Sequence, residues 1–153
     1  MIRLHPRGRP VEILVVDDNP GDVQLIAEAL QDANVANQLH TAGDGVATMA
    51  FLRREPPYQA APRPDLILLD LNLPKKDGRA VLSEIRADAN LAEIPVVVLT
   101  TSQADQDILR AYRLHANCYI TKPVDFDQFS QIIRAIDQFW FSIVTLPPAL
   151  ANQ

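Results

Sequence analysis

The sequence predicts one α/β domain, a doubly wound parallel sheet of five strands in the order 2-1-3-4-5 with five helices. Short apolar runs alternate with segments whose apolar residues recur at helical spacing. The runs are continuously apolar, which is typical of strands that helices cover on both faces. The joining segments are long enough to act as crossovers between parallel strands. A chain of 153 residues can bury the core of one such domain.

Composition and charge exclude several classes of protein. The formal net charge of -5 argues against a general nucleic-acid surface, which needs a basic field. The single cysteine, Cys118, excludes an internal disulfide framework and is typical of a reducing compartment. Residues 1–10 carry positive charge without an apolar core, and the apolar stretch 139–146 is too short to cross a bilayer. We therefore expect a cytoplasmic protein with no nucleic-acid and no membrane partner.

The first strand and helix follow a short leader. Residues 1–10 include two prolines and are interpreted as this leader. The strand covers 11–16, and the helix after it begins at Asn19 or Pro20, because proline is tolerated in a first helical turn. Asn34 is the expected end of the helix.

The second strand is shorter and more polar than the first. It covers 38–42, and the turn 43–45 leads into a helix that includes 46–52. The segment 55–64 follows and contains four prolines, which cannot continue a helix. It is therefore predicted to be a semi-rigid surface loop.

The stretch LILLDLNLP at 66–74 is predicted to form the centre of the sheet. Its strand covers 66–70, so Asp70 lies where the chain leaves the core. Open α/β sheets place their chemistry at the carboxyl ends of strands, although an isolated aspartate there can simply cap a turn. A third helix starts at Asp77, and 94–100 forms the fourth strand.

The last part of the chain adds one more strand between two helices. A fourth helix is expected over 105–115, a fifth strand over 118–121, and a last helix from about 125 to 144. The domain is then expected to span 11–146 and to be followed by a short tail over 147–153, with no output domain.

Residues of distinct chemistry stand at the ends of four predicted strands. The first strand is followed by Asp17 and Asp18, the third ends in Asp70, the fourth ends in Thr100, and the fifth is followed by Lys122. Parallel strands bring their carboxyl ends to one edge of the sheet, and the crevice lies between strands 1 and 3, where the strand order reverses. Strands often end in polar residues, but a set with these chemistries is hard to attribute to chance.

The clustered carboxylates predict a cation and a phosphoryl group. Three neighbouring carboxylates repel one another and need a counter-ion. Hard oxygen ligands suit Mg²⁺, which keeps some of its waters and commonly neutralises phosphoryl oxygens. Lys122 adds a second positive charge, and attack by an aspartate oxygen on phosphorus would give an acyl phosphate.

These motifs resemble the receiver domains of two-component response regulators, over most of the chain from Val11 to the last helix. The resemblance implies a flavodoxin-like sheet, with Asp70 as phosphoacceptor. It also implies a conformational switch made by Thr100 and Tyr119, and a cis peptide bond between Lys122 and Pro123. Such a protein is not an enzyme beyond catalysing its own phosphotransfer and dephosphorylation.

The same resemblance implies a magnesium site. Its ligands would be Asp18, Asp70 and the main-chain carbonyl of Asn72, with Asp17 acting through water. Two departures from the family pattern stand out: the proline-rich segment 55–64 is long, and Thr101 occupies a position where the family has a smaller residue.

Three further motifs are similar to the small regulators that partner bacterial phytochrome kinases: LNLPKKDG at 71–78, NCYITK at 117–122 and FWF at 139–141. This narrower resemblance implies that a phytochrome-like histidine kinase donates the phosphoryl group. The phosphorylated form would then alter the surface made by the fourth helix, the fifth strand and the fifth helix.

The last helix is predicted to form a homodimer interface. A helix of about 20 residues is about 30 Å long, whereas strands of about five residues span only about 17 Å. Its distal apolar residues would overhang the sheet, and large exposed apolar patches mark interfaces. The predicted interface residues are Phe139, Trp140, Phe141, Ile143 and Val144.

Alternative functions use the same sheet. A haloacid-dehalogenase-type phosphatase needs a second acid two residues after its nucleophile, and Asn72 stands there instead. A phosphorelay intermediate, which passes the phosphoryl group onward, and an unphosphorylated adaptor remain as alternatives. Turnover of p-nitrophenyl phosphate would identify the phosphatase, and phosphotransfer assays would separate the other two.

Overall fold

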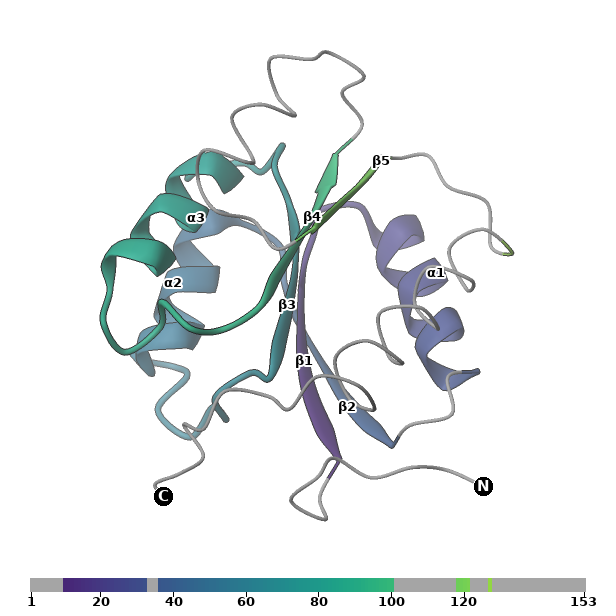
Figure 1. The fold of residues 1–153 in the computed structure, drawn as a ribbon, viewed down its shortest axis with the longest axis horizontal. Helices are drawn as coiled ribbons and strands as arrows, with labels where there is room; N and C mark the ends of the chain where they lie inside the picture. Colours follow the sequence, from purple (N-terminus) through teal and green to yellow (C-terminus); the bar gives the residue numbers. More distant parts are fainter. Residues whose placement is uncertain (1–9, 33–35, 101–117, 122–126, 128–153) are drawn as a thin grey trace.

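The computed structural model describes residues 10–32, 36–100, 118–121 and 127, and these contain a parallel sheet (Figure 1). The strand order is β2-β1-β3-β4-β5, as predicted. The strands are β1 (Val11–Val16), β2 (Asn37–Ala42), β3 (Leu66–Asp70), β4 (Val96–Thr100) and β5 (Cys118–Thr121). The helices predicted over 105–115 and 125–144 lie outside the described residues.

Helices cover both faces of the sheet. The described helices are α1 (Pro20–Gln31), α2 (Gly45–Arg53) and α3 (Gly78–Ala87). Figure 1 shows α1 on one face and α2 with α3 on the other. None of these described helices has both the length and the apolarity needed to cross a bilayer.

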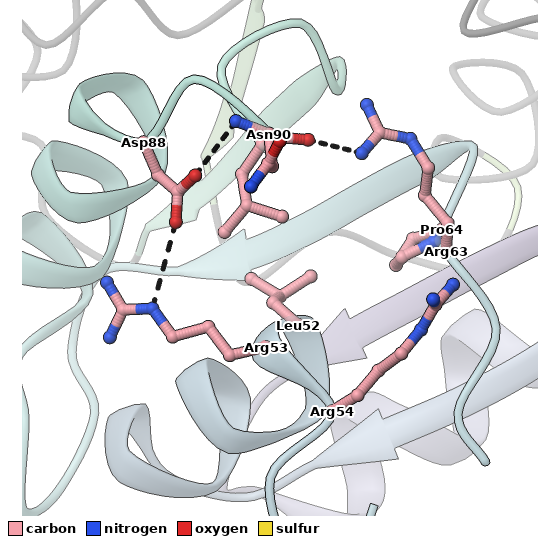
Figure 2. Close-up of a pocket in the computed structure, with 8 residues that line it drawn as sticks. Leu52, Arg53, Arg54, Arg63, Pro64, Asp88 and Asn90 are labelled. Carbon is pink, nitrogen blue, oxygen red and sulfur yellow. Dashed lines mark hydrogen bonds and ion pairs between the residues drawn. The ribbon is translucent and has the colours of Figure 1, made fainter. Parts of the chain in front are cut away.

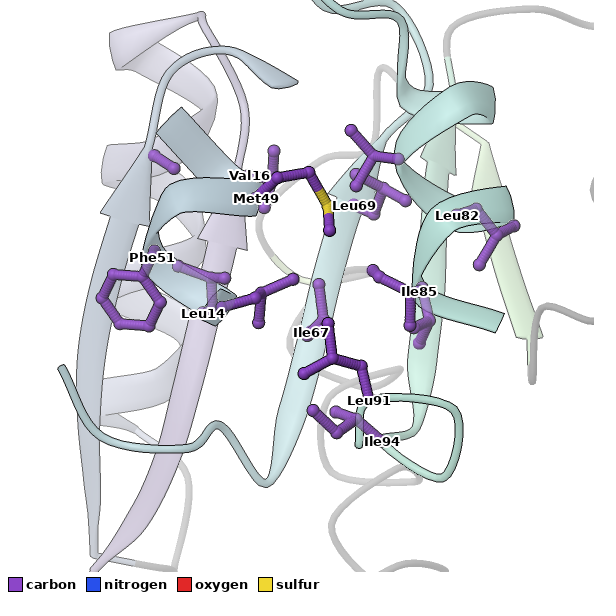
Figure 3. Packing of buried hydrophobic residues seen from close by; sticks show 14 of the residues in the cluster. Leu14, Val16, Met49, Phe51, Ile67, Leu69, Leu82, Ile85, Leu91 and Ile94 are labelled. Atoms are coloured by element: carbon purple, nitrogen blue, oxygen red, sulfur yellow. The ribbon is translucent and has the colours of Figure 1, made fainter. Parts of the chain in front are cut away.

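The core consists of two apolar layers, one on each face of the sheet. Alternate side chains of β1, β3 and β4 enter the layer beneath α2 and α3, which Figure 3 shows, and the intervening ones pack against α1. In β1, for example, Leu14 packs in the first layer and Val15 in the second, and both are fully buried. Burial of a leucine or valine side chain contributes about 1.5–3 kcal/mol. The strands are continuously apolar because helices and core side chains bury both of their faces.

Three boundaries differ from those predicted, and the smallest difference is at β2, which begins at Asn37, one residue earlier than expected. Helix α1 ends at Gln31 rather than at Asn34, which lies outside the described residues. The N–H of the C-cap residue Asp32 bonds to the carbonyls of Glu28 and Leu30, and the Nδ2 of Asn37 also donates to the carbonyl of Leu30, at 3.0 Å. Strand β4 begins two residues later than predicted, because the N–H of Ile94 bonds to the carbonyl of Leu91 within a turn.

The proline-rich segment 55–64 folds back onto the domain. It begins after Arg54, which caps α2 in the left-handed conformation with φ of 55°. The Nε of Arg54 donates to the carbonyl of Ala61 at 2.9 Å, which closes the loop across its base. Tyr58 packs against the core, with its ring centroid 5.6 Å from that of Phe51. The segment is therefore a packed part of the surface rather than a loose connection.

Candidate functional site

Three carboxylates meet at the carboxyl edge of the sheet. Strands β1 and β3 are parallel neighbours with Val16 opposite Leu69. The next residue on each strand is an aspartate, so Asp17 and Asp70 leave the sheet side by side. With Asp18 they form a cluster in which one oxygen of each carboxylate lies within 4.8 Å of the others. The strand register therefore brings Asp17 and Asp70 together, and Asp18 follows Asp17 directly in the chain.

Burial makes this cluster electrostatically demanding. The exposed fractions of Asp17 and Asp70 are 3% and 4%, whereas Asp18 is exposed. Like charges this close repel one another, and burial removes the water that would screen the repulsion. Main-chain donors offset part of this cost: the N–H of Asn19 donates to Asp17 Oδ1 and that of Asn72 to Asp70 Oδ1, each at 2.9 Å. These two hydrogen bonds also fix the orientation of the buried carboxylates.

The donor set fits a small divalent cation. Carboxylate oxygens are hard ligands, and Mg²⁺ binds oxygens at about 2.0–2.1 Å, so two ligands on opposite sides of one ion are about 4.2 Å apart. The 4.8 Å bound on the cluster is slightly wider than this span. The three acids can therefore hold such an ion with a small closing movement, or with one acid acting through a bridging water.

A cavity lies beside the two consecutive aspartates. Its volume is about 330 Å³, and its walls come from Asp17 and Asp18, the first turns of α1, and the end of β2. Asn19 caps α1 there by accepting the N–H of Gly21 at 2.8 Å and that of Asp22 at 3.1 Å. The exposed carboxylate of Asp18 is thus open to solvent on the α1 side, whereas Asp70 is not among the residues that line this cavity.

The start of α3 packs directly on the end of the central strand. The N–H of Gly78 donates to the carbonyl of Leu71 at 3.0 Å. A Cβ at position 78 would stand 2.3 Å from the carbonyl oxygen of Asp70 and 2.6 Å from the Cα of Leu71. Only a glycine allows this close approach, so Gly78 is a positioning residue for Asp70.

The loop between β3 and α3 is also attached to α2. A Cβ at Gly45 would stand 2.0 Å from the carbonyl oxygen of Lys76, so the loop backbone lies against the first turn of α2. Lys75 has a φ of 65°, in the left-handed region, and its Nζ lies 3.6 Å from Oδ2 of Asp44, the N-cap of α2. Residues 71–77 are therefore held from both sides.

A surface ion pair completes the attachment of this loop. Lys76 donates to Glu84 on α3, and that hydrogen bond lowers the pKa of the Glu84 carboxyl, with a smaller contribution from Arg53. None of these loop contacts is predicted from the sequence. The only signal for them is that α2 and α3 both begin with a glycine that follows an aspartate.

The remaining predicted site residues are only partly described. Thr100 ends β4 opposite Thr121, and Tyr119 lies opposite Val98, but the side chains of Thr100 and Tyr119 are not described. Lys122 and Pro123 lie outside the described residues. So do Thr101 and the predicted interface residues Phe139, Trp140, Phe141, Ile143 and Val144.

Comparison with known proteins identifies the family. The family model for the response regulator receiver domain matches residues 13–134. This chain belongs to that family. Its members are signalling proteins, and the strand order and acidic edge of this receiver domain agree with the assignment.

Individual relatives cover nearly the whole receiver chain. It is 47% identical over 140 residues to the response regulator Rcp1 of Synechocystis sp., covering 92% of this chain and 95% of Rcp1. The crystal structure of the phosphorylated cyanobacterial phytochrome response regulator RcpA is similar, with a TM-score of 0.84 and 53% identity over 90% of this chain and 99% of RcpA. The Mn²⁺-bound form of Rcp1 is similar too, with a TM-score of 0.82 and 47% identity over 90% of this chain and 99% of that one.

Proposed function

We propose that Asp70 of this response regulator accepts a phosphoryl group from a histidine kinase in a reaction that requires Mg²⁺. The observation that carries the proposal is the position of Asp70. Its carboxylate is buried at the end of the central strand, oriented by the N–H of Asn72, and close to the carboxylates of Asp17 and Asp18.

The residues of the acidic edge have two roles: they bind the metal ion, and one of them attacks phosphorus. Asp18, Asp70 and the main-chain carbonyl of Asn72 would hold Mg²⁺, with Asp17 acting through water. The bound ion would neutralise negative charge on the phosphoryl oxygens. An oxygen of Asp70 attacks phosphorus in line, and the bond from phosphorus to the kinase histidine breaks with its electron pair left on the imidazole.

Lys122, Thr100 and Tyr119 would read the phosphorylated state. The Lys122 ammonium is expected to bind a phosphoryl oxygen, with its chain direction set by a cis peptide bond to Pro123. Thr100 would donate to another phosphoryl oxygen, and Tyr119 would turn into the space that Thr100 leaves. A local charge change of this kind biases a two-state surface, here the one made by the segment 105–115, β5 and the last helix.

The proposed phosphoryl donor is a phytochrome-like kinase. Support comes from RcpA, a cyanobacterial phytochrome response regulator that is 53% identical to this chain. Because histidine kinases draw on ATP, we place the encounter in the cytoplasm. The kinase surface would contact the acidic edge of the sheet, since phosphorus must reach Asp70 there.

We also propose that two copies associate through the last helix, using the five residues Phe139, Trp140, Phe141, Ile143 and Val144. The support is the apolar sequence of that segment. Sedimentation at micromolar concentration, with and without a phosphoryl mimic, tests this. A monomer under both conditions contradicts it.

Phosphorylation by acetyl phosphate and Mg²⁺ tests the acceptor. Intact mass should rise by one phosphoryl group in the native chain, and hydroxylamine should remove it. Asp70→Asn should show no such product. Asp32→Asn is a matched control, because Asp32 is an exposed residue after α1. Labelling of Asp70→Asn at the native rate would show that the acceptor is another residue.

Transfer from purified kinases tests the donor. A phytochrome-type kinase labelled with ATP should transfer its phosphoryl group to the native chain faster than an unrelated histidine kinase does. Equal rates would contradict the partner assignment and leave the acceptor assignment intact.

A further inference from the structure

A second cavity lies at the other end of the central strand. Its volume is about 350 Å³, and it lies between the last turn of α2, the residues after α3, and the end of the proline-rich segment 55–64 (Figure 2). Pro64 lies in its wall just before β3, whereas Asp70 ends that strand. Because a strand rises about 3.3 Å per residue, the two sites are roughly 13 Å or more apart.

The lining of this cavity is basic, although the chain is acidic overall. Its charged residues are Arg53, Arg54, Arg63 and Asp88, so three positive charges face one negative charge. The Nε of Arg53 lies 3.8 Å from Asp88 Oδ2, and Asp88 Oδ1 accepts the N–H of Asn90 at 2.8 Å. Both oxygens of the Asp88 carboxylate therefore already have partners, Arg53 for one and the N–H of Asn90 for the other.

The other two arginines bond to neutral groups. Arg54 donates through Nε to the carbonyl of Ala61, and Arg63 donates through Nη1 to the carbonyl of Asn90. A guanidinium has five N–H donors, and these bonds to main-chain carbonyls do not neutralise its charge. Within this lining, Arg54 and Arg63 thus add two positive charges that no lining carboxylate compensates. Figure 2 shows them on one side of the cavity, with the pair formed by Arg53 and Asp88 on the other.

The cavity walls are ordered by packing. Arg54 is held at the end of α2, where its N–H bonds to the carbonyls of Ala50 and Phe51. The contact between Tyr58 and Phe51 holds the proline-rich segment that carries Arg63. The lining also includes two mostly buried leucines, Leu52 and Leu91, which provide apolar surface.

We infer that this cavity binds a small phosphorylated organic molecule. A phosphomonoester carries a charge of about -1.5 to -2 at neutral pH, which matches the two uncompensated arginines, whereas a single carboxylate would neutralise only one. Guanidinium groups bind phosphate oxygens in a bidentate manner. The organic part would contact Leu52 and Leu91. A volume of about 350 Å³ lies at the lower end of the range for small-ligand sites.

Titration with phenyl phosphate tests the site in the full chain, with a chelator present to keep metal from the acidic edge. The side-chain Nε–Hε signals of Arg54 and Arg63 in ¹H–¹⁵N spectra should shift and saturate, with a Kd of about 1 mM or tighter. Benzoate, which has the same ring and one carboxylate, should bind about tenfold more weakly. Inorganic phosphate, which lacks the ring, should also bind more weakly.

Variants locate the binding. The double variant Arg54→Gln with Arg63→Gln should weaken binding by about tenfold or more, and Arg63→Lys, which keeps the charge but not the fork, should have an intermediate effect. Lys75→Gln removes one positive charge outside the cavity, and Asp70→Asn alters the acidic edge; both should bind phenyl phosphate within about twofold of the native chain. Thermal unfolding of each variant checks that the fold is retained.

Any one of five results would overturn the inference. Unsaturated signals of Arg54 and Arg63, or native affinity in the double variant, would place any binding elsewhere. Equal affinity for benzoate would exclude recognition of the phosphate dianion. Equal affinity for inorganic phosphate would exclude the contact between the organic part and the leucines. A loss of binding in Asp70→Asn would assign the ligand to the acidic edge instead.

Discussion

The replacement Gly78→Ala should displace the residue on which phosphorylation depends. The new Cβ would stand 2.3 Å from the Asp70 carbonyl oxygen, and Cβ atoms essentially never come closer than 3.0 Å to another heavy atom. Either the start of α3 or the end of β3 must therefore move by at least the difference, 0.7 Å. Both neighbours are backbone atoms inside a packed core, so neither can turn away as a flexible side chain would.

Two opposing effects set the change in stability. Alanine in a helix is favoured over glycine by up to about 1 kcal/mol. Overpacking of a close-packed core costs about 1–3 kcal/mol. We expect the clash to dominate and the free energy of unfolding to fall by about 1–2 kcal/mol. For a domain of this size that lowers the midpoint of thermal unfolding by roughly 2–8 °C.

The same displacement should slow phosphorylation. A misplacement of about 1 Å at a reacting group can cost about 100-fold in rate. We therefore expect the initial rate of labelling by acetyl phosphate to fall at least about tenfold in Gly78→Ala. Gly43→Ala is the matched control, because a Cβ at Gly43 meets no atom within 4 Å. It should leave both the unfolding midpoint and the labelling rate near those of the native chain.

The outcomes show whether α3 or the end of β3 moves to remove the clash. A lower midpoint with a native labelling rate would mean that α3 moves and Asp70 does not, which refutes the positioning role of Gly78. A native midpoint and a native rate together would refute the close packing itself.

Three further predictions concern charge and capping. Glu84→Gln should reduce the loss of stability on acidification, because hydrogen bonding from Lys76 lowers the pKa of Glu84. The stabilisation by the charged Glu84 carboxylate is present above its usual pKa of 4.5 and is lost as pH falls through the lowered pKa. Urea unfolding at neutral and at acid pH measures this difference. Asp44→Ala removes the N-cap that accepts the N–H of Ala47 at 2.7 Å, and should cost about 1 kcal/mol in urea unfolding. Asp18→Asn should raise the free energy of unfolding without metal, because it removes a charge beside two buried carboxylates. It should also reduce the stabilisation by added Mg²⁺, which for the native chain is about 2.7 kcal/mol in the free energy of unfolding at 100 times the Kd. Unchanged acid sensitivity in Glu84→Gln would contradict the first prediction, and an unchanged free energy of unfolding in Asp44→Ala the second. Equal stabilisation of the native chain and Asp18→Asn by Mg²⁺ would contradict the third.

The sequence by itself determined the strand order and the identity of the acidic edge. Continuous apolar runs such as 66–69 are typical of strands buried on both faces, and parallel strands deliver their last residues to a common edge. The positions of Asp17, Asp18 and Asp70 relative to the ends of their strands therefore predict their meeting. Local pattern is sufficient here because the strand period and the hydrogen-bond register leave few alternatives.

Only the tertiary structure decided how closely the site is held and where the second cavity lies. The contact of Gly78 with the backbone of Asp70, and the position of Arg54 and Arg63 in the lining of one cavity, join residues that no periodic pattern relates. The last turn of α1 likewise accepts a hydrogen bond from Asn37 at the carbonyl of Leu30, a contact that sequence spacing does not reveal. Such contacts arise when separate elements pack, and their distances depend on the whole core rather than on local preference.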